Sequence, residues 1–320
     1  YKDYKFVTVT PHTHQMYLDR WIAPSLNLTN SSLINLFGWS IAIPEENIES
    51  ELRNLLLDND LAQTTDDLLR SKVRISNLND DLYVHSAYPT EAENSVFFGP
   101  DTYRFARFIR QVIEAKRFDN DSAFLNSTDV CRILDIGCGT GAGGIVAAKL
   151  IPHHKVNLVL NDINPLALNY ACANAAAAGF PASFVCGDAL TAVEGNFDLI
   201  VCNPPYLDDA SERSYRHGGE RLGRAFSVRI VAESIQRLDY GGVLVLYTGV
   251  AMSGCEDPFL AEIQSILAAS NLTEKKLTEK NFELFYEEID PDIFSEELTR
   301  SVYADCHRIA AVGLVITRTQ

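Results

Sequence analysis

The sequence lacks several features that would place the protein in a special class. No uninterrupted apolar run approaches the ~18 residues that a membrane-spanning helix needs, and the first residues, YKDYKFVTVTPHTH, lack the apolar core of a secretory signal. The seven cysteines form no CxxC pair and have no regular spacing. We therefore expect a cytoplasmic protein with buried free thiols, no metal site and no membrane association.

Positive charge is also scarce. The chain has 27 Lys and Arg against 43 Asp and Glu, a formal net charge of −16. Such a balance opposes long-range attraction to a phosphate backbone, although an acidic protein can still carry a local basic groove. Nucleic acid is therefore disfavoured as a partner, and a protein substrate is favoured.

Residues 1–88 are predicted to form a small accessory domain for substrate recognition. Apolar residues recur at helical spacing over residues 33–70, and Pro44-Glu45-Glu46 and Thr64-Thr65-Asp66-Asp67 resemble helix starts. Alternating runs at residues 72–76 and 82–86 flank a polar turn and predict a β-hairpin. Helices followed by a hairpin are typical of a winged-helix-like unit.

Residues 89–320 are predicted to form an α/β domain. Strand-like apolar runs alternate with helical segments; these runs are VCRILDIGC, VNLVLND, ASFVCGDA, FDLIVCNPP, GGVLVLYTG and RIAAVGLVITR. Runs this rich in Val, Ile and Leu indicate strands buried on both faces. The fold class that follows is a doubly wound, mostly parallel sheet covered by helices.

Three consecutive strand ends carry residues suited to a nucleoside cofactor. The first strand ends in Asp135 and a glycine-rich turn, whose residues are Gly137, Cys138, Gly139, Thr140 and Gly141. About 20 residues further on, the second strand ends in Asp162 and Ile163, where a carboxylate can accept hydrogen bonds from both ribose hydroxyls. The third strand is followed by Asp188 and Ala189, near where an adenine amino group would lie.

Two cofactors compete for such a site. A nicotinamide dinucleotide needs its pyrophosphate at the helix N-terminus, normally with a third glycine where this chain has Ala142. Asp135 stands two residues before the first glycine, and a carboxylate there suits the cationic amino acid group of S-adenosylmethionine better than a pyrophosphate. S-adenosylmethionine is therefore the predicted cofactor.

The succession LDIGCGTG, ND, GDA and NPPY resembles the class I S-adenosylmethionine-dependent methyltransferases, within the branch that methylates planar nitrogens. NPPY is shared by the release-factor glutamine N5-methyltransferases of the methyltransferase small domain group and by the N6-adenine methyltransferases. The resemblance implies a seven-stranded Rossmann-like sheet. It also implies that Pro100 and Thr102 help to cover the cofactor, although this chain lacks the arginine that follows the proline in the glutamine-methylating family.

The resemblance also implies roles for the four residues Asn203, Pro204, Pro205 and Tyr206. An amide or exocyclic amine is a poor nucleophile because its lone pair is delocalised. The Asn203 side-chain oxygen and the Pro204 carbonyl can hold both N–H hydrogens, which directs the lone pair at the methyl group. Pro205 stiffens the turn formed by residues 203–206, here called the elbow, and Tyr206 is expected to stack on the planar group.

Two later segments carry weaker resemblances. Residues 215–223, YRHGGERLG, resemble the glycine-bearing segment that forms part of the substrate wall in the glutamine-methylating family. The core PDIFSEEL before the last strand resembles the end of a group of bacterial methyltransferases. The acidic residues around this core are expected to form a solvated helix face or to contact a basic partner.

The predicted function is N-methylation of a protein glutamine amide. The alternative within the same chemistry is methylation of an adenine N6 or guanine N2 amine in RNA or DNA, which requires a basic stripe from Lys72, Arg74, Arg104, Arg107 and Arg110. A nicotinamide-dependent oxidoreductase is opposed by NPPY and the missing glycine. A catalytically silent binding module is opposed by the complete set of strand-end residues.

Overall fold

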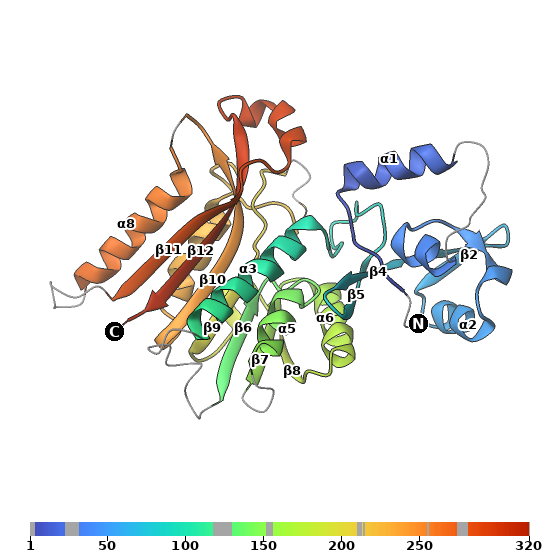
Figure 1. Cartoon of the computed structure of the whole chain (residues 1–320), viewed down its shortest axis with the longest axis horizontal. Coiled ribbons are helices and arrows are strands. Elements are labelled where there is room, and N and C mark those ends of the chain that lie inside the picture. Colours follow the sequence, from blue (N-terminus) through green and yellow to red (C-terminus); the bar gives the residue numbers. More distant parts are fainter. Residues whose placement is uncertain are drawn as a thin grey trace.

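A seven-stranded sheet forms the centre of the protein in the computed structural model (Figure 1), which describes residues 4–22, 32–117, 130–151, 156–209, 213, 215–254, 256–273 and 281–319. The strands are β6 (Cys131–Ile136), β7 (Val156–Asp162), β8 (Ala182–Cys186), β9 (Phe197–Cys202), β10 (Leu238–Met252), β11 (Phe282–Asp290) and β12 (Arg308–Arg318). Their order is β11-β12-β10-β9-β6-β7-β8, with β12 antiparallel to both of its neighbours and the other pairs parallel. This confirms the predicted seven-stranded, mostly parallel sheet.

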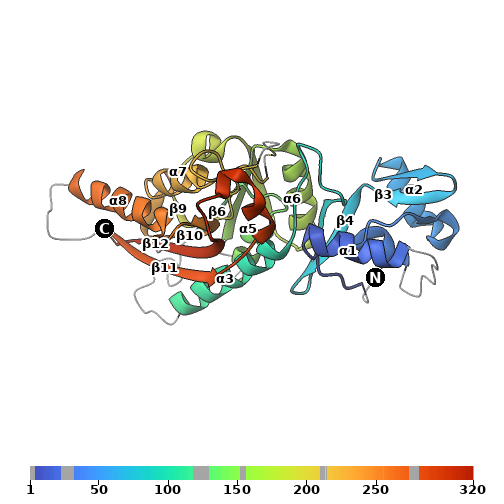
Figure 2. The ribbon, with the colours of Figure 1, turned by 90° about the horizontal axis from the view of Figure 1, so that it is seen from above.

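Helices cover both faces of the sheet (Figure 2). α3 (Pro100–Arg117), α5 (Ala142–Lys149) and α6 (Pro165–Ala177) pack on one face, where Ile109, Ile145 and Ala171 are completely buried. α7 (Ala225–Ser234) and α8 (Pro258–Thr273) cover the other face with Ile230 and Phe259. Because both faces are covered, the central strands are rich in Val, Ile and Leu.

The strand order reverses at β6. The chain continues from β6 to β7 and β8 on one side and returns to β9 on the other side of β6. In open α/β sheets such a reversal leaves a crevice beyond the carboxyl ends of the two strands, and this is where ligands bind. The carboxyl ends of β6 and β9 therefore lie side by side, with Asp135 near the end of β6 and Asn203 directly after β9.

The N-terminal unit combines helices with a small sheet. α1 (Pro11–Ile22), the π-helix η1 (Ile34–Gly38), the 3-10 helix η2 (Glu45–Asn47) and α2 (Ser50–Asp58) accompany three strands, β1 (Ile43–Pro44), β2 (Ala62–Thr65) and β3 (Leu68–Ser71), in the order β1-β3-β2. Its own apolar core contains Phe6, Leu36, Ile43 and Leu69. The unit lies beside the large domain, next to α6 (Figure 1).

The helix start predicted at Thr64-Thr65-Asp66-Asp67 is wrong. Thr64 and Thr65 end β2, and the two aspartates form the turn into β3 with φ of 51° and 61°. A two-residue hairpin turn requires positive φ at both central positions, and Asp tolerates this conformation better than most residues. Pro44-Glu45-Glu46 opens only the short helix η2, and α2 begins later, at Ser50.

The hairpin predicted before the large domain is confirmed. β4 (Val73–Leu78) and β5 (Asp81–Ser86) pair antiparallel around Asn79-Asp80. Leu78 and Tyr83 pack in the core of the large domain, so the hairpin joins the two parts of the protein. Asn174 of α6 fixes this junction: its amide accepts from Val84 N at 2.8 Å and donates to Val84 O at 3.1 Å and to Thr140 O at 2.9 Å.

The expectation of buried thiols is only partly correct. Cys131, Cys138 and Cys202 are buried, Cys306 is half-buried, and Cys172 and Cys186 are exposed. Cys172 is exposed on α6, and Cys186 ends the edge strand β8. Cys255 lies outside the described residues. In the described part of the chain, no helix is both long and apolar enough to cross a membrane.

Replacing Asn174 by alanine is expected to lower the free energy of unfolding by about 2 kcal/mol, because Val84 and Thr140 lose partners at a buried junction. Asn169→Ala, at an exposed position of the same helix, is the matched control and is expected to stay within about 0.5 kcal/mol of the wild type. Denaturant unfolding measures both variants. Equal effects of the two substitutions would contradict the proposed contribution of Asn174.

Candidate functional site

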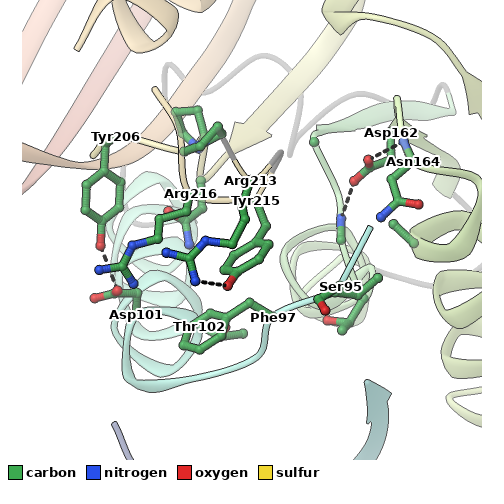
Figure 3. Close-up of a pocket in the computed structure, with 18 of the residues that line it drawn as sticks. Ser95, Phe97, Asp101, Thr102, Asp162, Asn164, Tyr206, Arg213, Tyr215 and Arg216 are labelled. Carbon is green, nitrogen blue, oxygen red and sulfur yellow. Dashed lines mark hydrogen bonds between the residues drawn. The ribbon is translucent and has the colours of Figure 1, made fainter. Parts of the chain in front are cut away.

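A cavity of about 730 Å³ opens at the carboxyl ends of the central strands (Figure 3). On the β6 to β8 side it is lined by Asp135, Gly137, Cys138, Gly139, Thr140, Asp162, Ile163, Asp188 and Ala189. On the opposite side it is lined by Thr102 and by the elbow residues Asn203, Pro204, Pro205 and Tyr206. The sequence-predicted cofactor and acceptor residues therefore meet in one cavity, apart from Gly141 and Pro100, which lie at the first turns of α5 and α3 outside its lining.

The glycine-rich turn has a conformation that explains its composition. Gly137, Gly139 and Gly141 have φ of 62°, 54° and 76°, in the left-handed region. A side chain at Gly141 would also approach Leu160 and Ala171 to 3.2 and 3.3 Å. These glycines let the chain leave β6 and enter α5 within a few residues, which leaves bare backbone facing the cavity.

Asp135 is a buried carboxyl group at the end of β6. It is only 2% exposed, and its Oδ2 accepts a hydrogen bond from Gly144 N at 2.7 Å. Burial raises the pKa of Asp135 to about 7. A buried acid of this kind becomes ionised when a cation binds beside it, so Asp135 fits the cationic amino acid group of S-adenosylmethionine.

Asp162 is held at the end of β7 by two backbone donors. Gly139 N donates to its Oδ2 at 2.8 Å and Asn164 N to its Oδ1 at 2.9 Å (Figure 3). Burial raises its pKa. The carboxylate is fixed at the cavity wall, and each oxygen keeps acceptor capacity for a ribose hydroxyl.

Asp188 has a partner that the sequence did not indicate. Its carboxylate forms an ion pair with Arg229 of α7 at 2.9 Å. The predicted contact with an adenine amino group therefore stays a prediction, and it would have to share the carboxylate with Arg229. Ala189 next to it is buried, at the start of the 3-10 helix η4 (Ala189–Ala192).

Asn203 carries an unpaired polar atom. Its Oδ1 is buried, and no residue of the described chain donates a hydrogen bond to it. An unpaired buried oxygen costs about 1–3 kcal/mol, and native structures contain few of them. Since Asn203 lines the cavity at the end of β9, its oxygen is available to a donor that enters from outside.

Tyr206 is anchored in a way that the sequence did not predict. Its phenol donates to Asp101 Oδ2 at 2.7 Å (Figure 3), and Tyr247 of β10 donates to Asp101 Oδ1 at the same distance. The Tyr206 residue is 8% exposed. A side chain at Gly249 would come within 2.3 Å of the Tyr206 ring, so only glycine leaves room for it.

Residues 215–223 pack directly on the elbow. Leu207 N donates to Arg216 O at 3.1 Å, and Gly218 N donates to Leu207 O at 2.8 Å. Side chains at Gly218 or Gly223 would collide with the backbone, at 1.8 Å from Gly223 O and 2.2 Å from Tyr206 O respectively. The glycines of this segment therefore allow it to form part of the cavity wall.

Charged residues after the elbow pair with one another. Asp209 is bound by Arg213, with the closest N–O distance at 2.6 Å, and these hydrogen bonds lower the pKa of Asp209 to about 2. His217 Nδ1 accepts from Asp209 N at 3.2 Å, so this nitrogen is already occupied. Among the residues that the structure describes, no three His, Cys, Asp or Glu side chains gather as metal ligands.

The glycine turn, the acidic strand ends and an Asn-Pro-Pro-Tyr elbow around one cavity define a class I S-adenosylmethionine-dependent methyltransferase domain. Residues 110–253 match the family model described as "Methyltransferase small domain". The nicotinamide alternative is thereby set aside.

Similar proteins act on different substrates. The release factor glutamine methyltransferase of Deinococcus radiodurans is 38% identical over 125 residues, which are 36% of this chain and 44% of that protein. The ribosomal RNA small subunit methyltransferase C of Serratia proteamaculans is 34% identical over 119 residues, which are 35% of this chain and 33% of that protein. The chain thus spans less than half the length of these relatives.

Solved structures show weaker similarity. The 16S rRNA N2 G1207 methyltransferase of T. thermophilus, in complex with AdoMet and guanosine, has a TM-score of 0.46 and 12% identity, covering 88% of this chain and 64% of that chain. A SAM-dependent methyltransferase from Agrobacterium tumefaciens has a TM-score of 0.48 and 12% identity, covering 83% of this chain and 80% of that chain. These values do not distinguish between substrates.

Binding of S-adenosylhomocysteine at pH 6 is expected to release close to one proton. Asp135, with a pKa of about 7, is mostly protonated at pH 6 in the free protein, and a cationic amino group beside it favours the ionised form. At pH 8 the carboxyl is already ionised, so the release should nearly vanish. Calorimetry in two buffers of different ionisation enthalpy measures the proton count, and equal release at both pH values would contradict this role.

The same raised pKa affects the stability of the free protein. The pKa of Asp135 is raised from the usual 3.8 of an aspartate, so its bound proton stabilises the folded state fully below pH 3.8. This contribution is lost as the pH rises through about 7. Asp135→Asn should therefore show a smaller loss of stability than the wild type between pH 4 and pH 7 in thermal unfolding, and parallel curves would contradict the assignment.

Proposed function

We propose that the protein transfers the methyl group of S-adenosylmethionine to a planar nitrogen, and that this nitrogen is a glutamine side-chain amide of a protein. The unpaired, buried Oδ1 of Asn203 in the cavity carries the proposal. A group with N–H hydrogens would satisfy this oxygen. The same contact would hold the nitrogen at the end of β9, across the crevice from Asp135.

The residues of the chain have separate tasks in this reaction. Asp135 and Asp162 bind and orient the cofactor through its amino group and its ribose. Bound S-adenosylmethionine supplies a methyl group on a positively charged sulfur, and that charge disappears during transfer. Asn203 Oδ1 and the Pro204 carbonyl hold the two N–H hydrogens of the acceptor, and alignment of this kind contributes up to about 7–11 kcal/mol in ideal cases.

No strong base is needed before the transfer. The nitrogen becomes more acidic as the new N–C bond forms, and its proton then leaves to water. The occupied Nδ1 of His217 agrees with this, because the histidine nearest to the elbow in sequence is engaged with Asp209 N.

The distribution of positive charge favours a protein acceptor over nucleic acid. Of the five residues from which the nucleic-acid alternative would need a basic stripe, Lys72 pairs with Asp60 at 2.5 Å, and Arg74 is 4% exposed and donates to Gly38 O. Arg104 pairs with Asp101 and Asp290, and Arg110 pairs with Glu114 at 3.6 Å. Among the described residues, Arg107 is the only one of the five that is exposed without an ion pair, so most of their positive charge is already neutralised by acidic neighbours or buried.

Asn203→Ala is expected to reduce methyl transfer at least about 100-fold, the usual effect of removing one transition-state hydrogen-bonding group. Affinity for S-adenosylhomocysteine should change less than about threefold. Because the substitution also removes an unpaired buried oxygen, the thermal midpoint should not fall. Asn157→Ala on β7 is the control. Turnover near the wild-type rate in Asn203→Ala would remove the proposed role.

The acceptor is identified by incubating a cell extract with the protein and radiolabelled S-adenosylmethionine. Label that protease removes and nuclease does not supports the proposed protein substrate. Acid hydrolysis should then release it as methylamine from N5-methylglutamine. Label that nuclease releases would replace the glutamine proposal by the amine alternative while leaving the role of Asn203 in place.

A further inference from the structure

The connection between β11 and β12, residues 291–307, contains the PDIFSEEL core to which no role has been assigned. It folds into two short 3-10 helices, η5 (Ser295–Thr299) and η6 (Ser301–Tyr303). The acidic residues before it lie on strand β11, so the expectation that the acidic residues share one solvated helix face is wrong. Phe294, Glu296 and Glu297 of this connection line the cavity. The segment is therefore part of the active-site wall.

Ion pairs and hydrogen bonds fix this connection to the chain that follows the elbow. Glu297 accepts from Arg216 at 2.5 Å and from Arg300 at 3.0 Å. Arg300 also binds the Asp208 side chain at 3.1 Å, and Asp208 N donates to the Tyr303 hydroxyl at 2.8 Å. Because the side chains of Glu297 and Arg216 are only 14% and 18% exposed, solvent screens their attraction less than at the surface.

Phe294 has a strained backbone at the centre of this wall. Its φ of 54° and ψ of 40° lie in the left-handed region, which bulky side chains rarely adopt. Such a conformation costs on the order of 1–3 kcal/mol, so the surrounding contacts must hold it in place. The neighbouring hydrogen bonds do this: Ile293 N donates to Ile309 O at 2.7 Å, and Glu297 N donates to Phe294 O at 2.9 Å.

The strain directs an aromatic ring towards the elbow. The Phe294 ring centroid lies 6.1 Å from that of Tyr206, with 58° between the planes, and the Arg216 guanidinium lies 5.5 Å from the Phe294 centroid. Phe294 is half-buried and lines the cavity, whereas Tyr206 is 8% exposed and its hydroxyl is bound to Asp101. Of these two rings, that of Phe294 has the larger accessible surface.

We propose that Phe294 is an acceptor-binding residue, whose ring packs against the planar group that Asn203 holds. In this arrangement Tyr206 is a positioning residue that ties the elbow to Asp101. The inference rests on the proposed function, because it assumes that a planar acceptor enters beside Asn203. It extends that function by assigning a substrate contact to the β11–β12 connection, outside the family segment of residues 110–253.

Phe294→Ala and Phe294→Leu test the aromatic contact. Both are expected to raise KM for the labelled acceptor about tenfold, the order expected from aromatic stacking, and to leave the Kd for S-adenosylhomocysteine within about twofold. Phe294→Tyr keeps the ring and should stay within about threefold of the wild-type KM. Phe285→Ala, at a 55% exposed position of β11, is the control and should change neither constant.

Several outcomes would overturn the proposal. If KM stays at the wild-type value in Phe294→Leu and rises only in Phe294→Ala, the side chain acts by filling space and not through its aromatic ring. If both variants weaken cofactor binding as much as acceptor binding, the role is structural. Phe294→Gly removes the ring and also the backbone strain, because glycine adopts a positive φ freely. It therefore controls for misfolding of the other variants, and its KM should rise as in Phe294→Ala.

The proposed glutamine reaction and the role of Phe294 fail in distinguishable ways. The polymer that carries the label tests the reaction, whereas the ratio of variant to wild-type KM on that same polymer tests Phe294. Label on nucleic acid with a tenfold rise in Phe294→Ala contradicts the glutamine reaction alone. Label on protein with an unchanged KM contradicts the role of Phe294 alone, and no label with the wild-type protein contradicts both.

Discussion

One buried carboxylate connects the parts of this active site. Asp101, in the first turn of α3, receives hydrogen bonds from Tyr206 of the elbow and Tyr247 of β10, both at 2.7 Å, and from Arg104 at 3.2 Å. Arg104 in turn pairs with Asp290 of β11 at 2.9 Å. A carboxylate that is 6% exposed needs such partners, and here they come from the elbow, from β10 and from α3 itself. The direction in which the elbow leaves β9 therefore depends on α3 and on the antiparallel side of the sheet.

This dependence divides the cavity into two halves of different construction. The cofactor half is built from strand ends and from turns that follow them immediately, so its geometry is local in sequence. The acceptor half combines the elbow, residues 215–223 and the β11–β12 connection, held by pairs such as Arg216–Glu297 and Arg300–Asp208. Because the two halves are built from different segments, a substitution in one half need not disturb the other.

The same division explains what the sequence predicted. The sheet, the β4–β5 hairpin and the cavity-lining positions of Asp135, Asp162 and Asn203 follow from apolar runs and turn residues, which are local signals. Residues 64–67 were misassigned because Thr-Thr-Asp-Asp suits both a helix start and a tight turn, and only pairing with β3 decides between them. The contact between Asp101 and Tyr206 joins residues 105 positions apart, so no local sequence pattern predicts it. Likewise, the acidic partners of Lys72, Arg104 and Arg110 are distant in sequence or not distinguished by any local pattern, so their ion pairs could not be predicted.

The central claim is that an elbow anchored by Asp101 presents the free oxygen of Asn203 to the acceptor beside the cofactor. A crystal structure of the protein with S-adenosylhomocysteine tests it most directly. We expect an amino group at Asp135, the ribose at Asp162, an intact Tyr206–Asp101 hydrogen bond, and Asn203 Oδ1 facing the sulfur without a protein donor. A homocysteine moiety placed away from Asp135, or an Asn203 side chain turned away and bonded to the protein, would contradict it.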